Sequence, residues 1–426
     1  MTLRGRRAFV RTMGCQMNRH DSARMAEILL AAGCEPADDS SGADVLVLNT
    51  CSVRGRAESK ARSALGEAVR WKRTRPGRRI VLAGCVAQQF GRRWLEIEPE
   101  VDAVVGPDGI AGVARILEEI DGGARPMVEV GFDGGAAEDF PPARPDLAPP
   151  GPTAFVTVSK GCDERCTFCI VPSVRGPLRS RPPRDVAAEA EALVAAGTGE
   201  IVLIGQAVNA YRHGDTGFGA LVRRVGAVPG IARLRYTSPH PRFVDEDLVA
   251  AHAETAALCE HVHLPVQSGS DRVLRRMGRG YARERYLAIV ERLRAARPGA
   301  TFGTDVIVGF PGETEADFEE TMSLLAEVRP TQVFSFAYSA RPGTPAERWE
   351  DDVPAPEKSR RLRTLQELAE RLARERLASL TGTTVEVLVE GPSDRGGGSS
   401  QGRTRNNDVV HVVPAGGAPP LPGTIL

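Results

Sequence analysis

The sequence predicts an α/β protein with an amino-terminal doubly wound parallel-sheet domain, a central partial (β/α) barrel and a small carboxyl-terminal β-barrel. Short β-branched runs alternate with amphipathic helical segments over residues 1–120 and again over 153–380, which is typical of parallel sheets covered by helices. Residues 121–152 are rich in Gly, Pro and Asp and are predicted to be a linker. From 381 to 426 only β-type segments and Gly/Ser turns remain. A chain of 426 residues is long enough for about three domains.

The amino-terminal domain is predicted from strands separated by helical patterns. The candidate strands are residues 8–12, 45–49, 80–84 and 103–106. Helix formers with apolar positions three and four residues apart lie between them, at 21–32 and 58–72. One further short strand is predicted inside the linker, at 127–130.

The central domain is predicted to contain six strand–helix units. The candidate strands are residues 154–159, 200–205, 233–236, 261–264, 304–308 and 333–338. Helices are predicted at 183–196, 281–296 and 315–327, and right-handed crossovers place the loops after the strands on one face. A long helix is predicted after Pro356, and strands at 383–390 and 403–413 follow it.

Composition and charge exclude several classes of protein. The 55 basic residues balance 55 acidic ones, so net charge alone does not indicate a nucleic-acid partner. No apolar run is long enough for a membrane span, and the start lacks a signal-peptide pattern, so we expect a cytoplasmic protein with no membrane attachment. In that reducing compartment the eight cysteines are expected to bind metal, to react or to lie inertly in the core.

Three cysteines in the central domain lie within eight residues. Cys162, Cys166 and Cys169, here called the central triad, follow directly on the first barrel strand. Three thiolates on one tight loop can hold three corners of a 4Fe-4S cluster and leave the fourth iron open. Zinc is the alternative, but a structural zinc site generally needs four ligands, and no second pair lies nearby.

Three further cysteines each follow a predicted strand of the first domain. Cys15, Cys51 and Cys85, here called the amino-terminal triad, are expected at the shared carboxyl edge of a parallel sheet, where ligands collect. They can converge on a second cluster, or they can be three buried structural cysteines. Cys34 and Cys259 are interpreted as inert thiols.

Motifs around both triads resemble the radical SAM methylthiotransferase family. In the first domain these motifs are residues 14–18, 49–54 and 84–88. In the central domain they are residues 159–172, 175–176, 179–181, 205–206, 236–241, 263–270, 304–313, 334–339 and 341–345. Gln16 and Met17 are typical of the tRNA branch of the family (the MiaB type), which methylthiolates carbon 2 of an isopentenylated adenosine at position 37, beside the anticodon.

The resemblance implies two 4Fe-4S clusters and S-adenosylmethionine (SAM) as cofactors. The open iron of the central triad binds SAM, whose reductive cleavage yields a 5′-deoxyadenosyl radical, and the amino-terminal triad holds an auxiliary cluster that supplies or carries the inserted sulfur. The clusters carry the chemistry, so no catalytic side chain is predicted. The two domains are expected to face each other with the base between them.

Six polar residues are candidate contacts to SAM, because they lie near the carboxyl ends of barrel strands or flank the glycines that follow them. They are Gln206, Asn209, Gln267, Ser268, Asp305 and Glu313. The alternative for each is a role in capping or turn formation.

Six arginines are candidate contacts to the anticodon stem-loop of tRNA. They are Arg73, Arg75, Arg78 and Arg79 in a basic stretch, and Arg403 and Arg405, which are expected to share one face of a strand. The basic stretch can equally be a solvated helix face. The carboxyl-terminal module resembles a TRAM domain that is incomplete, with an open edge.

Three other functions are alternatives to the methylthiolation of isopentenylated adenosine. Other branches of the family carry out the same reaction on threonylcarbamoyladenosine in tRNA or on a ribosomal protein. They typically have other residues than Gln16 and Met17 after the first cysteine. A non-catalytic iron–sulfur RNA-binding protein is the alternative from another class. For the enzyme we expect a reducing electron donor as a second partner and a monomeric chain.

Overall fold

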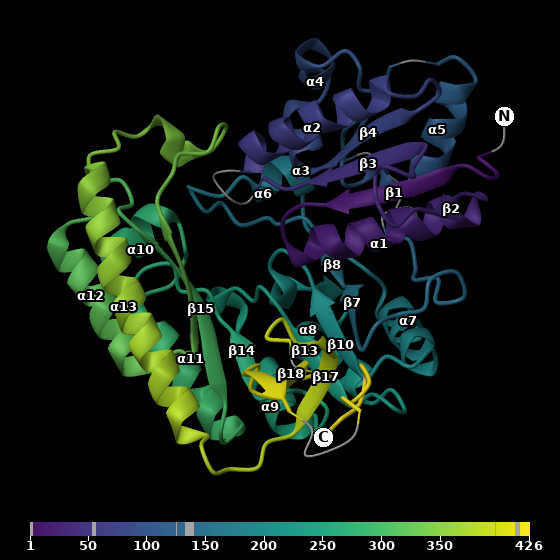
Figure 1. Ribbon diagram of the computed structural model, residues 1–426. Coiled ribbons are helices and arrows are strands. Elements are labelled where there is room, and N and C mark those ends of the chain that lie inside the picture. Colours follow the sequence, from purple (N-terminus) through teal and green to yellow (C-terminus); the bar gives the residue numbers. More distant parts are fainter. Residues whose placement is uncertain (1–2, 53–56, 125, 133–139, 397, 414–417) are drawn as a thin grey trace. The chain divides into compact units, whose positions relative to one another are not determined.

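The computed structural model describes residues 3–52, 57–124, 126–132, 140–396, 398–413 and 418–426. The chain forms two compact units (Figure 1). The first comprises Met1–Pro149, Lys160–Asp163 and Ile170–Leu178, and the second comprises Pro150–Ser159, Glu164–Cys169 and Arg179–Leu426. Val53 and Arg54 of the second predicted motif lie outside the described residues, as does part of the predicted linker. Among the described helices, none combines the length and the apolar character needed to span a bilayer.

The first unit is built on one parallel sheet of six strands, in the order β2-β1-β3-β4-β5-β6. Its strands are β1 (Arg7–Thr12), β2 (Glu35–Pro36), β3 (Val45–Thr50), β4 (Arg79–Gly84), β5 (Ala103–Val105) and β6 (Met127–Glu129). The four strands predicted before residue 120 are confirmed. The short strand predicted inside the linker at 127–130 is also confirmed, as β6, which pairs in parallel with β5 at the sheet edge.

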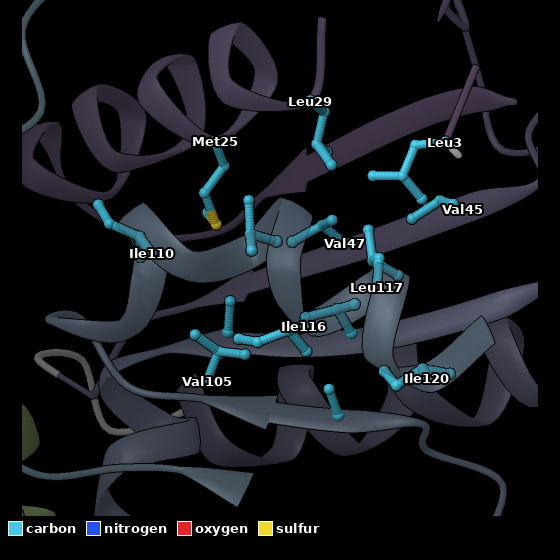
Figure 2. Packing of buried hydrophobic residues seen from close by; sticks show 14 of the residues in the cluster. Leu3, Met25, Leu29, Val45, Val47, Val105, Ile110, Ile116, Leu117 and Ile120 are labelled. Atoms are coloured by element: carbon cyan, nitrogen blue, oxygen red, sulfur yellow. The ribbon is translucent and has the colours of Figure 1, made fainter. Parts of the chain in front are cut away.

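Helices cover both faces of this sheet because its central strands are apolar on both sides. The helices of the first unit are α1 (Gln16–Ala31), α2 (Ala57–Arg73), α3 (Cys85–Phe90), α4 (Arg93–Ile97), η1 (Gly109–Gly112), α5 (Val113–Asp121) and α6 (Val171–Arg175). On one face Val47 of β3 packs with Met25 of α1 and Ile116 of α5 (Figure 2). On the other face Leu48, the next residue of β3, packs with Leu65 of α2. The doubly wound arrangement therefore follows from the alternation of side chains along β3.

The second unit contains the six predicted barrel strands in two parallel sheets of three, ordered β13-β10-β7 and β14-β15-β16. They are β7 (Thr153–Thr157), β10 (Glu200–Ile204), β13 (Arg233–Tyr236), β14 (His261–His263), β15 (Thr301–Val308) and β16 (Gln332–Ala337). Between the two sheets the described residues form one isolated bridge, from Leu234 to Leu258, so the ladder is interrupted there. The predicted partial barrel is confirmed with this interruption.

The helices of the second unit are α7 (Pro183–Ala195), η2 (Val208–Ala210), α8 (Phe218–Gly226), η3 (Pro241–Phe243), α9 (Glu246–Glu254), α10 (Asp271–Met277), α11 (Arg283–Ala296), α12 (Glu315–Val328), η4 (Pro345–Arg348) and α13 (Ala355–Ser379). Among them, α7, α11 and α12 match the three predicted within the barrel to within two residues, and the others, apart from α13, were not predicted. Short strands also occur, at β8 (Ser159–Lys160), β9 (Arg179–Ser180), β11 (Arg212–His213) and β12 (Thr216–Gly217). The long predicted helix is α13, whose Leu365 and Leu372 are buried.

The carboxyl-terminal module is an antiparallel sheet of β17 (Val387–Pro392), β18 (Ser400–Thr404) and β19 (Val409–Val412). The single strand predicted over 403–413 is wrong, because a turn interrupts it. Asn407 in this turn has φ +66°, a conformation that Asn tolerates better than most residues. The predicted open edge is covered at β17, because Val387 and Leu426 exchange backbone hydrogen bonds of 2.8 and 3.0 Å.

The turn between β18 and β19 docks on the amino-terminal ends of barrel strands. Arg233, the first residue of β13, is fully buried and donates to the carbonyl of Arg403 at 2.7 Å. Arg235 donates to the carbonyl of Thr404, also at 2.7 Å. Charged donors to backbone carbonyls are among the stronger hydrogen bonds in proteins, so these arginines anchor the module.

Candidate functional site

The amino-terminal triad lies at one edge of the sheet of the first unit. Cys15 follows β1 and immediately precedes α1, Cys51 follows β3, and Cys85 is the first residue of α3 after β4. These three strands are neighbours in a parallel sheet, so their carboxyl ends share the edge. Cys15 and Cys51 are hydrogen-bonded, and Cys15 is close enough to Cys85 for their charges to interact. The structure thus brings the three thiols together, and their role as metal ligands stays a prediction.

Gly14 permits the close approach of Cys15 and Cys51. Its φ is +116°, and a Cβ placed on it would lie 2.1 Å from the Cβ of Cys51. Any other residue at this position would push the Cys51 loop away.

Two asparagines lock the loops that carry these cysteines. Asn18 Nδ2 donates to the carbonyl of Thr50 at 2.7 Å and to Asn49 Oδ1 at 3.2 Å. Asn49 Nδ2 donates in return to the carbonyl of Asn18 at 2.9 Å. Both side chains are fully buried, where an unsatisfied amide costs about 1–3 kcal/mol. The start of α1 and the end of β3 are therefore held as one piece.

Arg175 of α6 reaches this edge from 90 residues beyond Cys85. Its Nε donates to Cys85 Sγ at 3.2 Å, and its Nη2 lies 2.8 Å from Asp21 Oδ2 and 3.1 Å from Asn18 Oδ1. The residue is 3% exposed, so its charge acts in a poorly screened environment. Its Nη1 is also buried and has no hydrogen-bond partner among the described residues.

The buried charges shift the titration of these groups. The hydrogen bond from Cys51 and the charge of Arg175 lower the pKa of Cys15 to about 6, against the effect of burial. Burial raises the pKa of Cys85, although Arg175 acts in the opposite direction. Burial alone would raise the pKa of Asp21, but Arg175 and His20 outweigh it and lower that pKa to about 2. The site therefore combines an ionised Asp21 with a buried arginine.

These residues fit a 4Fe-4S cluster. Such a cluster binds each cysteine sulfur through a different iron, and hydrogen bonds to its sulfurs and nearby charge tune it. The triad supplies three sulfurs, and Arg175 supplies a buried cation with an unused donor. In the part of the chain that the structure describes, no three His, Cys, Asp or Glu side chains are placed to bind one metal ion.

The central triad lies on the loop that follows β7 and β8. The Cys162 amide donates to the carbonyl of Gly176 at 3.1 Å, and the Cys169 amide donates to the carbonyl of Cys166 at 3.0 Å. Gly161 has φ +79°, and a Cβ on it would lie 1.9 Å from the carbonyl oxygen of Pro177. Cys162 belongs to the first unit and the other two cysteines to the second. The convergence of this triad, and its position opposite the amino-terminal triad, stay predictions.

Arg279 is a second buried arginine on a cysteine sulfur. Its Nη1 donates to Cys166 Sγ at 3.3 Å, and its Nη2 donates to the carbonyl of Pro265 at 3.1 Å. Burial opposes its charge, but the neighbouring Tyr281 and Cys166 keep its pKa above the usual value. Arg175 lies in a motif that the sequence marks, whereas no sequence signal points to Arg279.

Three of the six candidate SAM contacts are engaged within the fold. Asn209 donates to the His240 carbonyl at 3.0 Å and accepts from its amide at 2.7 Å. Ser268 is fully buried and accepts from the amide of Ser270 at 3.2 Å. Glu313 pairs with buried Arg361 at 2.8 Å, and burial raises its pKa. These side chains brace loops near the strand ends, and direct contact with SAM stays a prediction.

The other three candidates are Gln206, Gln267 and Asp305. Gln206 follows β10, as predicted. Gln267 has φ +74°, and its backbone pairs with β15 through the carbonyl of Asp305 at 2.8 Å. Asp305 lies within β15, and its Oδ1 is 3.2 Å from His263 Nε2. Their contacts to SAM also stay predictions.

The basic stretch before β4 lies at the sheet edge opposite the cysteines. β4 runs for six residues from Arg79 to Gly84, and Cys85 follows it, so the strand separates Arg79 from Cys85 by ~20 Å. Arg78 is buried and donates to the carbonyl of Trp71 at 2.7 Å, so its guanidinium is engaged inside the fold and does not face the solvent as an RNA contact requires. Arg79 pairs with Asp121 at 2.9 Å and is also mostly buried. Arg73 and Arg75 are exposed, and their contact with RNA stays a prediction.

Arg403 and Arg405 do not share one face of a strand, which corrects the prediction. Arg403 is in β18, whereas Arg405 is in the turn after it, because β18 ends at Thr404. Arg405 pairs with Glu260 at 2.8 Å and holds the module on the barrel. Arg403 pairs with Glu390 at 3.0 Å. RNA binding by Arg403 stays a prediction, whereas the guanidinium of Arg405 is engaged on Glu260, Ala256 and Leu258.

Two family models match this chain. Residues 156–325 match the Radical SAM superfamily, and residues 7–106 match a family described as uncharacterized protein family UPF0004. The first match covers most of the barrel with its central triad, and the second covers most of the parallel sheet with the amino-terminal triad.

Proteins of similar sequence share one description. The chain is 51% identical to a tRNA-2-methylthio-N(6)-dimethylallyladenosine synthase of Sorangium cellulosum, with 96% of this chain and 87% of the relative covered. Proteins with the same name from Anaeromyxobacter dehalogenans and Acidithiobacillus ferrooxidans are 47% and 46% identical, with 98% and 95% of this chain and 91% of each relative covered.

Solved structures of similar fold are more distant in sequence. The radical S-adenosylmethionine methyltransferase TsrM from Kitasatospora setae has a TM-score of 0.61 and 16% identity, with 80% of this chain and 77% of that chain covered. The cobalamin-dependent S-adenosylmethionine radical enzyme OxsB has a TM-score of 0.56 and 13% identity, with 87% and 56% covered. At such identities these structures show the fold alone.

Proposed function

Since this chain belongs to the family of tRNA-2-methylthio-N(6)-dimethylallyladenosine synthases, which are radical SAM enzymes, we propose that it methylthiolates carbon 2 of an isopentenylated adenosine at position 37 of tRNA. Its cofactors are two 4Fe-4S clusters and SAM. Cys162, Cys166 and Cys169 hold the cluster that binds SAM, and the amino-terminal triad holds the auxiliary one. The observation that carries the proposal is the gathering of three thiols and one buried arginine at a single sheet edge.

The reaction requires radical chemistry because the C–H bond at carbon 2 of adenine has no acidity that a side-chain base could use. Cys162, Cys166 and Cys169 would hold the cluster that binds SAM, and together these cofactors would supply the radical chemistry that breaks this C–H bond. The side chains of the chain bind and orient the clusters and exclude water. Asn18 and Asn49 hold the loops of Cys15 and Cys51 in register. Arg175 donates a charged hydrogen bond to the sulfur of Cys85.

The proposed partners are the anticodon stem-loop of tRNA and a low-potential electron donor, and the proposed location is the cytoplasm. An unpaired loop favours access, because the target base must leave its stack to reach the enzyme. Exposed Arg73 and Arg75, together with half-buried Arg403, are the remaining candidate phosphate contacts. We propose that the chain acts as a monomer.

The shared name of the relatives favours the isopentenyladenosine substrate over threonylcarbamoyladenosine and over a ribosomal protein. The shared name also favours an enzyme over an iron–sulfur protein that binds RNA without catalysis. No structural observation supports a second function strongly enough to propose it.

The test of the proposal combines nucleoside analysis with an iron count. Mass spectrometry of tRNA nucleosides from a deletion strain should show loss of 2-methylthio-isopentenyladenosine, restored by the wild-type chain and not by Cys51→Ala. Anaerobically reconstituted wild-type protein should contain about eight irons and Cys51→Ala about four, because one cluster is lost. Unchanged nucleosides in the deletion strain would remove the proposed substrate, and about four irons in the wild type would remove the auxiliary cluster.

A further inference from the structure

Each cysteine triad has one buried arginine on one of its sulfurs. Arg175 Nε lies 3.2 Å from Cys85 Sγ in the first unit, and Arg279 Nη1 lies 3.3 Å from Cys166 Sγ in the second. The two residues are 3% and 6% exposed. Arg175 ends α6, whereas Arg279 lies in the loop between α10 and α11. The two share no hydrogen-bond partner among the described residues, so the same kind of contact occurs twice within one chain.

The two arginines differ in how their charge is balanced. Arg175 forms an ion pair with Asp21 at 2.8 Å, and Asp21 is itself 1% exposed. Arg279 donates instead to neutral acceptors, the hydroxyl of Tyr281 at 3.2 Å and the carbonyl of Pro265 at 3.1 Å. None of the ion pairs found within the described residues involves Arg279. The sulfur of Cys85 therefore faces an arginine whose charge is balanced by Asp21. The sulfur of Cys166 faces an arginine with no carboxylate partner among the described residues.

We propose that Arg175 and Arg279 are positioning residues that set the reduction potentials of the auxiliary and the SAM-binding cluster, and that Asp21 offsets the effect of Arg175. One-electron reduction adds a negative charge to a cluster. A buried guanidinium that donates a hydrogen bond to a ligand sulfur stabilises that charge, so the potential rises. A buried carboxylate beside the guanidinium acts in the opposite direction. In the reaction the electron comes from the low-potential donor, and in the test it comes from dithionite.

The inference rests on the clusters of the proposed function, and it goes beyond them by separating electrostatic from structural roles. A merely structural Arg175 would hold α6 on Asn18 and Asp21, and its loss would lower stability or iron content only. An electrostatic role makes a signed prediction, because removal of the cation and removal of the anion must shift the potential in opposite directions.

The experiment is a potentiometric EPR titration of the full-length protein with both clusters reconstituted. SAM alters the signal of the cluster that it binds, so the two midpoints can be assigned separately. We expect Arg175→Met to shift the auxiliary midpoint to lower potential and Asp21→Asn to shift it to higher potential. Arg279→Met should lower the midpoint of the SAM-binding cluster. Lysine at either arginine position should give a smaller shift than methionine, because it keeps the charge.

Arg181→Met is the matched control, because Arg181 is also buried and ion-paired, but its partner is Glu189. It should leave both midpoints unchanged. If Arg175→Met fails to retain the auxiliary cluster, Asp21→Asn and Arg175→Lys carry the test. The inference is overturned if variants with full iron content keep the wild-type midpoints, or if Arg175→Met and Asp21→Asn shift the auxiliary midpoint in the same direction. A wild-type iron count near four would instead overturn the proposed function.

Discussion

Asn18 and Asn49 hold each other across 31 residues of sequence: the Nδ2 of Asn18 donates to Asn49 Oδ1, and the Nδ2 of Asn49 donates to the carbonyl of Asn18. Each residue belongs to a motif that also contains a cysteine of the amino-terminal triad. This reciprocal contact explains why an amide side chain is needed at both positions. It fixes the distance between the loops of Cys15 and Cys51 by backbone anchoring rather than by the thiols themselves.

Asn49→Ala should lower the free energy of unfolding by about 1–3 kcal/mol, because it removes the buried hydrogen bonds that the Asn49 side chain makes with Asn18 and with the Ser22 hydroxyl. It should also reduce the iron bound by the auxiliary cluster, since the loops lose their register. Urea unfolding and an iron assay measure the two effects. Glu67→Ala, at an exposed ion pair with Arg11 in the same unit, is the control and should change stability by less than about 1 kcal/mol. An Asn49→Ala protein with normal iron content would contradict the anchoring role.

Gly14→Ala should abolish the auxiliary cluster, because the added Cβ would lie 2.1 Å from the Cβ of Cys51. The expected iron content falls from about eight to about four per chain, with the cluster of the central triad retained. Gly5→Ala is the matched control: Gly5 also has a positive φ, of +80°, but nothing lies within 4 Å of its added Cβ. A Gly14→Ala protein that keeps about eight irons, as Gly5→Ala is expected to do, would contradict the steric conflict with Cys51.

Arg405→Gln should loosen the carboxyl-terminal module without removing a phosphate contact. The substitution removes the ion pair with Glu260 and the donors to the carbonyls of Ala256 and Leu258. Limited proteolysis should then cleave the module faster, while the salt dependence of tRNA binding stays unchanged. A slope of log K against log salt reduced by about 1 would instead assign Arg405 to RNA binding.

Acid should destabilise the second unit in part through His252. Its Nε2 lies 2.7 Å from the hydroxyl of Tyr236, and burial, aided by the charge of Arg297, lowers its pKa to about 4. An unfolded histidine titrates near about 6.5, so between these values the unfolded chain binds a proton that the folded chain does not. Stability from this residue is therefore present above that range and is lost as pH falls through it, by up to about 1.4 kcal/mol per pH unit.

The measurement is urea unfolding at pH 7.5 and pH 5.0 for wild type and His252→Gln. Glutamine can still accept from the Tyr236 hydroxyl but does not titrate, so the loss of stability on acidification should be smaller in the variant. The same loss in both proteins would exclude His252 as a source of the pH dependence.

Much of the fold was predictable because it depends on local patterns. The short apolar run of β3 and the helical spacing of the leucines in α13 are recognised from residues close together in the sequence. The amino-terminal triad was predictable for the same reason, since each cysteine directly follows a strand and parallel strands share their carboxyl edge. The turn at Asn407 was missed although the sequence contains a signal for it, because Asn406, Asn407 and Asp408 are consecutive turn-forming residues.

The sequence by itself determined the elements, the cysteine positions and the family motifs. Only the tertiary structure decided that Arg175 meets Cys85 across 90 residues and that Arg279 meets Cys166 across 113. It also placed Arg78 in the interior, although the sequence made it one of a cluster of cations. The physical reason is that the burial of a charge, and the sulfur or carboxylate that compensates it, depend on packing between distant segments, which local spacing does not encode.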